Sequence, residues 1–199
     1  MAINLQKGQS IILDKSEYDL SLLTTGLGWD VAKSKKGLAG LISGRSDFDL
    51  DGYALLLESD GRVRDYKQDV IYYGHLRSSD GTVSHSGDNL TGEGEGDDEQ
   101  IVIRPNDLPA KYSKIVLGVS IYDAANRRQH FGMVENAFVR AVDANDVEIA
   151  RYSLSGNESY EGQISMLMGE LYREGNQWKF TALGTPSDKD LNRVVGSFM

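Results

Sequence analysis

The chain is a succession of short β-type runs separated by tight turn signals, and this spacing restricts its fold more than any other feature. Two long runs carry a turn at their centre: NAFVRAVDANDVEIARYSL turns at residues 143–146, and SMLMGELYREGNQWKFTALG turns at residues 174–177. Strands joined by such short loops pair antiparallel, because a parallel pair needs a crossover of a dozen or more residues. The sequence therefore predicts hairpins.

Further β-type runs predict eight to ten strands in all. They are QSIIL near residue 10, the strand at 53–58 with a partner from Arg62, DVIYYG (69–74), EQIVIRP (99–105) and SKIVLGVSIYD (113–123). Helical patterns are few: NRRQHFGMV gives one short turn, and SDKDLNRVVGSFM gives a C-terminal helix with Ser187 as its N-cap. We expect a mainly β fold, an antiparallel β-sandwich with a few short helices and a C-terminal helix, in one domain over residues 1–199.

Composition excludes several classes of protein. The 199 residues carry a net charge of −9, which argues against nucleic-acid binding and favours cations as partners. Cysteine is absent, so the chain has no disulfides and no thiol chemistry of its own. The N-terminus has no apolar run typical of a signal peptide, and no stretch approaches the ~18 to 20 apolar residues of a membrane span. We expect a cytoplasmic protein.

The stretch HSGDNLTGEGEGDDE (85–99) concentrates six carboxylates in the twelve residues from Asp88 to Glu99. No lysine or arginine in the stretch balances them, and neighbouring like charges repel. Calcium prefers six to eight oxygen ligands in flexible geometry, and the glycines allow main-chain carbonyls to turn inward. The candidate side-chain ligands are Asp88, Asn89, Thr91, Asp97, Asp98 and Glu99. We expect the loop to be expanded without metal; a merely solvated acidic loop is the open alternative.

The stretch DFDLDGYALLLE (47–58) matches the EF-hand loop expression, but its context contradicts that interpretation. An EF-hand needs a helix on each side, whereas the residues after Gly52 read as a buried strand. Alternation along that strand sends Asp49 and Asp51 to one face, where they serve a neighbouring cation site or cap the strand entry.

Catalysis has weak support. The carboxylates Glu93, Glu95 and Glu99 are available for acid–base chemistry, yet nothing in the sequence selects a pair. We interpret His85 as a loop contact rather than a base. The prediction is a protein that is not an enzyme, with a metal-dependent hydrolase or nucleotide-acting enzyme as the alternative.

Several motifs together resemble the TerD family of tellurite-resistance and stress-response proteins. They are GLGWD (26–30), DFDLDGYALLLESDGRV (47–63), the acidic stretch 85–99, IYDAANRRQHFGMVENAFVRAVD (121–143) and GELYREGNQWKFTALG (169–184). The resemblance implies a cytoplasmic calcium-binding β-sandwich. It implies metal ligands at Asp88, at Asn89 and from Glu93 through Gly94 to Glu99, with Asp30 as a ligand from a distant loop. Asp49 and Asp51 fall on the family's FDLD element, and Gly52 stands where the family often has Ala.

The resemblance also implies a role. The chain is expected to bind one or two calcium ions and to act as a metal-dependent interaction module in tellurite resistance or general stress response. Such proteins are often encoded with membrane partners of the tellurite-resistance system, so partners are expected there, with peripheral attachment to the inner membrane through them as an option. A calcium-dependent membrane-docking module is a further alternative. The residues that would contact the membrane lie in the loop at residues 30–46; they are Lys33, Lys35, Lys36, Leu38, Leu41 and Ile42. A mobile solvated loop is the other interpretation of this segment.

Overall fold

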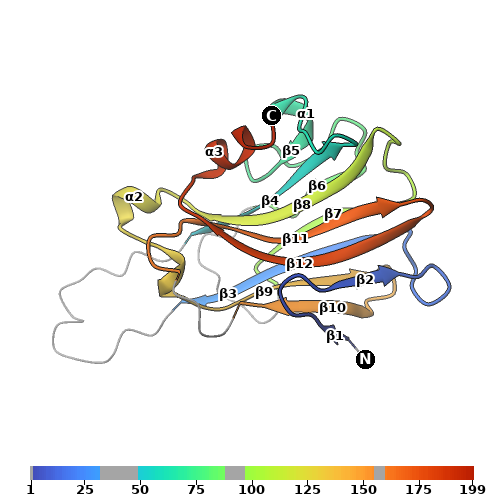
Figure 1. The fold of residues 1–199 in the computed structure, drawn as a ribbon, viewed down its shortest axis with the longest axis horizontal. Helices are drawn as coiled ribbons and strands as arrows, with labels where there is room; N and C mark the ends of the chain where they lie inside the picture. The colour runs from blue at the N-terminus through green and yellow to red at the C-terminus, as the bar shows by residue number, and fades with distance from the viewer. Residues whose placement is uncertain (1, 32–48, 88–96, 155–159) are drawn as a thin grey trace.

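Two six-stranded sheets pack face to face in the computed structural model, which describes residues 2–31, 49–87, 97–154 and 160–199 (Figure 1). Sheet A has the order β1 (Ile3–Asn4), β10 (Glu148–Ser153), β9 (Val134–Asp143), β3 (Leu23–Val31), β7 (Glu99–Ile103), β6 (Val83–His85). Sheet B has the order β2 (Ser10–Leu13), β12 (Gln177–Ser187), β11 (Ser165–Glu174), β8 (Tyr112–Ile121), β4 (Leu50–Glu58), β5 (Val70–Ile71). Every described pairing is antiparallel except that of β1 with β10. The predicted sandwich is confirmed.

The two predicted hairpins are the β9–β10 and β11–β12 pairs. Asp143 closes the first turn by accepting hydrogen bonds from the backbone N–H groups of Asn145 and Val147, both at 2.9 Å. In the second, Glu174 pairs directly with Gln177. Gly175 has a φ of +60°, a left-handed conformation that glycine adopts without steric cost. Local turn chemistry therefore sets the register of both hairpins.

The main core lies between the sheets, and β4 shows how one strand serves two cores. Leu50, Ala54 and Leu56 belong to the inter-sheet core, whereas Tyr53 and Leu55 belong to a second cluster on the outer face of sheet B. Successive strand residues point to opposite faces, so a continuous apolar run is required where both faces are covered. The cover on the outer face comes from the helical segments α1 (Tyr66–Asp69) and α3 (Leu191–Gly196), as Figure 1 shows.

The C-terminal helix begins later than predicted. Ser187 is the last residue of β12, where it pairs with Ser165. The N-cap is Asp190, whose carboxylate accepts a hydrogen bond from the N–H of Arg193 at 2.9 Å. The short turn predicted around residue 130 is two separate turns, α2 (Ala124–Arg127) and a 3₁₀ turn (Phe131–Met133).

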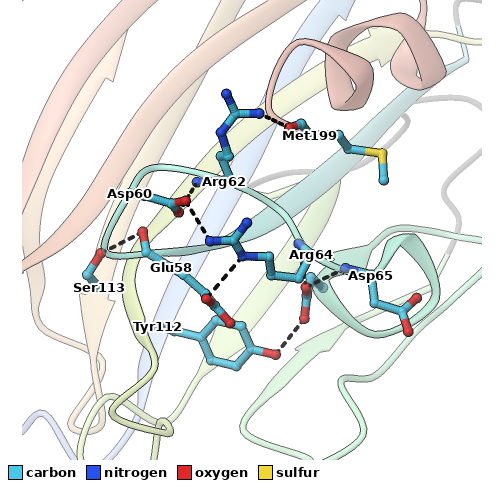
Figure 2. A network of polar contacts seen from close by, with 9 residues as sticks. Glu58, Asp60, Arg62, Arg64, Asp65, Tyr112, Ser113 and Met199 are labelled. Carbon is cyan, nitrogen blue, oxygen red and sulfur yellow. Dashed lines mark hydrogen bonds and ion pairs between the residues drawn. The ribbon is translucent and has the colours of Figure 1, made fainter.

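The predicted partner strand from Arg62 was wrong. The chain after β4 instead forms the polar network of Figure 2. The Arg64 guanidinium contacts Glu58 at 3.1 Å and Asp60 at 2.5 Å, and the Arg62 guanidinium donates to the backbone oxygen of Met199. The Arg64 ion pairs fold the segment back onto the end of β4, while Arg62 and the Val63 N–H, which donates to the Phe198 carbonyl at 2.8 Å, hold it against the C-terminus.

The predicted strand at 69–74 is also shorter, because only Val70 and Ile71 pair with β4. Asp69, 1% exposed, ends α1 instead. Its carboxylate accepts hydrogen bonds from the Arg64 and Asp65 N–H groups and from the Tyr112 hydroxyl at 2.5 Å. Burial and this hydrogen bond raise the pKa of Tyr112.

The strand β3 was not predicted, although it lies between β9 and β7 in sheet A. Its Gly26 and Gly28 weaken the strand signal, since glycine is depleted in strands. Tertiary packing explains Gly26: a Cβ there would overlap the carboxylate of Asp97. Asp30, expected on a loop, lies in this strand opposite Glu135.

A candidate cation site at the end of sheet A

The acidic stretch leaves and re-enters the fold at one end of sheet A, between β6 and β7. Its base is closed by hydrogen bonds between Ser86 and Gln100: the Ser86 N–H donates to the Gln100 carbonyl at 2.8 Å, and the Gln100 N–H donates to the Ser86 hydroxyl at 2.9 Å. Five of the predicted ligands between these anchors lie outside the described residues; they are Asp88, Asn89, Thr91, Glu93 and Gly94.

Asp98 is held against β3 by two contacts. Its N–H donates to the Leu27 carbonyl at 2.8 Å, and its carboxylate accepts a hydrogen bond from the N–H of Trp29 at 2.8 Å. Asp30 follows Trp29 directly, at a register irregularity in the pairing of β3 with β9. The fold thus brings the Asp98 carboxylate to the backbone beside Asp30, although 68 positions separate the two in sequence.

Asp97 is engaged by an arginine. Its carboxylate oxygens accept hydrogen bonds from Arg140 Nε at 2.7 Å and Nη2 at 3.0 Å, and from Gln100 Nε2 at 3.0 Å. The side chain is 1% exposed. Arg140 also bonds Glu148 at 3.1 Å, and the hydrogen bond to Asp97 raises the pKa of Arg140. The charge of Asp97 is therefore already balanced by a planar, bidentate partner.

Glu99 points into the space between the sheets. Its Oε2 accepts a hydrogen bond from the Gly52 N–H of β4 at 2.5 Å and lies 3.2 Å from His85 Nε2, and both side chains are fully buried. His85 Nδ1 accepts from the Gly87 N–H at 3.0 Å, so a neutral ring carries its proton on Nε2, facing Glu99 and the Gly52 carbonyl (3.1 Å). His85 is thus a buried strand residue that links two sheets, and its interpretation as a loop contact was wrong.

Asp49 and Asp51 lie elsewhere. They precede and open β4 on the same face as Tyr53, which confirms the predicted alternation. Asp49 forms an ion pair with Arg127 at 3.4 Å. Gly52, between Asp51 and Tyr53, faces the opposite side toward Glu99, so the sheet itself separates the two aspartates from the Glu99 carboxylate. No EF-hand is formed, because Leu50–Glu58 is a strand.

Within the described residues, no three His, Asp or Glu side chains are grouped so that they could hold a metal ion. The donor chemistry nevertheless suits calcium, since the Asp98 carboxylate is a hard oxygen donor at the edge of the acidic stretch. In the described part of the chain, no helix is long and apolar enough to cross a membrane. The residues on which the membrane-docking alternative depends, from Lys33 to Ile42, lie outside it.

Sequence reasoning missed the buried position of His85 and the pairing of Arg140 with Asp97. His85 shares the buried face of β6 with Val83, and this three-residue strand is too short to recognise from the sequence. Arg140 lies in an alternating strand whose outward-facing positions usually carry solvated charges, and its partner is 43 positions away. Only the packing of β3 between β7 and β9 brings Arg140 to Asp97.

Comparisons with known proteins cover nearly the whole chain. The family model described as TerD domain matches residues 1–198. The chain is 46% identical to the tellurium resistance protein TerX of Serratia marcescens, over 96% of this chain and 95% of that protein. It is 43% identical to the stress response protein SCP2 of Bacillus subtilis (strain 168), over 100% of both. The crystal structure of a homologue of telluride resistance protein (TerD) from Streptomyces coelicolor A3(2) aligns with a TM-score of 0.64 at 21% identity, over 88% of this chain and 95% of that one. This last likeness concerns the fold alone.

Proposed function

The chain belongs to the TerD family of tellurium resistance and stress response proteins, and from this premise we propose that it is a non-enzymatic, calcium-binding, metal-dependent interaction module. The observation that carries the proposal is the closed base of the acidic stretch. There Asp98 is fixed beside Asp30 by the Trp29 N–H, and Asp97 lies next to it in the chain.

The proposed ligand set combines this fixed base with the stretch above it. Asp98 and Asp30 supply carboxylates at the base, and the remaining oxygen ligands come from residues 88–94, because calcium takes six to eight. Bound calcium would supply positive charge for the carboxylates of the stretch other than Asp97, which Arg140 balances, and Glu99, which bonds Gly52. The predicted partners, other proteins of the tellurite-resistance system, would recognise the surface that the stretch forms when its charge is neutralised.

Two predicted ligands take supporting roles in this proposal. Asp97 shares its charge with Arg140, which fixes the entry of the acidic stretch into β7. Glu99 points into the space between the sheets and ties β7 to β4 through Gly52. Asp49 and Asp51 stand outside the proposed site, on the outer face of sheet B.

The geometry around His85 supports a role without catalysis. Both of its ring nitrogens contact groups of the protein, and its side chain is fully buried. A general base must reach a proton on a bound substrate, which a ring enclosed between two sheets does not do.

Calorimetric titration of calcium into chelator-stripped protein tests the proposal, with magnesium as the ion control. We expect micromolar binding of one or two calcium ions, weakened about tenfold or more (~1.4 kcal/mol) in Asp98→Asn. Asparagine still accepts the Trp29 N–H, so this variant loses charge without losing the backbone contact.

Asp146→Asn is the matched control. Asp146 is exposed in the β9–β10 turn with a φ of +61°, a conformation that asparagine also tolerates. The Asp146→Asn variant removes one negative charge far from the acidic stretch in sequence and should leave the calcium affinity unchanged. No heat at millimolar calcium, or an equal loss in both variants, would contradict the proposal.

A further inference from the structure

A hollow of about 290 Å³ is lined by residues of α3, the end of β8 and the segment that follows β5. Figure 1 shows where these elements lie on the outer face of sheet B. Four tyrosines line it: Tyr66, Tyr72, Tyr73 and Tyr122. The candidate cation site at the end of sheet A accounts for none of them. Tyr73 and Tyr122 are 38% and 46% exposed, which is unusual for large aromatic side chains that gather in one place.

The rings form a continuous series with edge-to-face contacts. The centroids of Tyr66 and Tyr72 are 6.2 Å apart, those of Tyr72 and Tyr73 are 5.2 Å apart, and those of Tyr73 and Tyr122 are 6.2 Å apart, at interplanar angles of 75°, 83° and 81°. In such a series the edge of one ring meets the face of the next, so the ring faces turn in several directions around the hollow.

The series is held by backbone contacts rather than by the rings alone. Tyr72 and His75 exchange two backbone hydrogen bonds, at 3.1 and 2.9 Å, so Tyr73 stands at the tip of a two-residue turn. The ring of Tyr72 lies over Gly74, where a Cβ would come within 2.7 Å of the ring. The Tyr66 hydroxyl donates to Asn192 in α3 at 2.9 Å. The rings are thus in place before any ligand arrives.

Carboxylates complete the lining. Asp51, 4% exposed, lies at the floor, and Asp123 and Asp190 lie at the rim. Asp123 accepts a hydrogen bond from Asn126, and Asp190 caps α3. None of the described residues that line the hollow is basic, although Arg193, outside the lining, forms an ion pair with Asp190 at 3.9 Å. The carboxylates lie beside ring faces whose quadrupole also attracts cations.

The chain already binds a guanidinium at the edge of this surface. Arg127 places its guanidinium carbon 5.2 Å from the centroid of the Tyr122 ring and an amino nitrogen 3.4 Å from the carboxylate of Asp49. The same two kinds of group, tyrosine rings and aspartate carboxylates, line the hollow. The chemistry that holds Arg127 is therefore available next to it for a second guanidinium.

We propose that this tyrosine–aspartate hollow is a docking site for an arginine side chain carried by a partner protein. Arginine suits it better than lysine, because a planar guanidinium stacks on a ring face while its N–H groups bond carboxylates. A protein partner suits it better than a free cation, because the exposed rings of Tyr73 and Tyr122 extend the apolar surface around the hollow. Tyrosine is enriched in protein interfaces for that reason.

The test uses the blocked tripeptide acetyl-Gly-Arg-Gly-amide and its citrulline counterpart, which has the same shape without the charge. Ring resonances of Tyr73 and Tyr122 are followed by NMR of the full chain labelled in tyrosine, and are assigned by their loss in Tyr73→Leu and Tyr122→Leu. We expect saturable shifts with the arginine peptide below about 10 mM and at least fivefold weaker shifts with the citrulline peptide.

Variants locate the binding. Tyr73→Leu and Asp190→Asn should each weaken it about two- to fivefold, and asparagine at 190 keeps the helix cap. The control Tyr172→Leu removes a tyrosine on β11 whose ring already lies 5.6 Å from Lys179, and it should change nothing. Absence of a saturable shift, equal binding of the citrulline peptide, or an equal loss in the control would overturn the proposal.

Discussion

Replacing Glu99 by alanine is the perturbation that most directly tests how the acidic stretch is attached to the fold. Glu99 begins β7 in sheet A, yet its carboxylate accepts the N–H of Gly52 in sheet B at 2.5 Å. It also lies 3.2 Å from His85 Nε2, with both side chains fully buried. The variant therefore removes one of the two polar links between β4 and sheet A at this end; the other is the contact of His85 Nε2 with the Gly52 carbonyl.

The expected magnitude follows from what is left behind. The Gly52 N–H loses its acceptor in a buried place, which costs about 1–3 kcal/mol. His85 Nε2 keeps the Gly52 carbonyl at 3.1 Å, so it adds less. The one lost methylene, the buried Cγ, adds about 0.8 kcal/mol. We expect Glu99→Ala to lower the free energy of unfolding by about 2–4 kcal/mol, a large part of the ~5–15 kcal/mol typical of a domain.

Glu99→Gln tests whether Glu99 acts through its hydrogen bond to Gly52 or as a calcium ligand. The amide oxygen can still accept the Gly52 N–H, but its NH₂ group then faces the Nε2–H of His85. We expect a smaller loss, about 1–2 kcal/mol, in urea denaturation at constant calcium. A change below about 0.5 kcal/mol in Glu99→Ala would refute the reasoning. Calcium affinity reduced tenfold in Glu99→Gln, with stability unchanged, would instead make Glu99 a ligand.

Two further perturbations address the outer face of sheet A. Gly26→Ala would make the new Cβ overlap the Asp97 carboxylate, so it should lower the free energy of unfolding by about 1–3 kcal/mol in thermal denaturation. The control Gly196→Ala has no atom near the new Cβ and should not lower it. Equal losses in the two variants would contradict this prediction. Hydrogen bonds from Arg151 and a second arginine lower the pKa of Glu148, so its stabilising contribution is present at neutral pH and is lost as the pH falls through that lowered value. The stability difference between the wild type and Glu148→Gln should therefore narrow below about pH 4.3 in pH-dependent urea denaturation, and a constant difference would exclude the link.

Sequence patterns predicted the parts of the fold that local chemistry decides. The turns at 143–146 and 174–177 are fixed by residues within a few positions of each other, so their hairpins were predicted correctly. The run at 53–57 predicted a buried strand because both its faces are apolar. The predictions for the segment after Arg62 and for the start of α3 were wrong, because distant contacts determine both. Arg62 bonds the backbone oxygen of Met199, and Ser187 pairs with Ser165 as the last residue of β12.

The same distinction between local sequence and distant contacts applies to the candidate cation site. The sequence by itself determined the concentration of carboxylates in residues 88–99, because composition and spacing are local, and this is enough to predict a cation as the partner. Only the tertiary structure decided which carboxylates are committed elsewhere. Asp97 bonds Arg140 and Glu99 bonds Gly52, and both partners lie more than forty positions away in sequence. The weak strand β3 is similarly decided by its neighbours, since Gly26 is required by the Asp97 side chain that packs over it and not by any local preference.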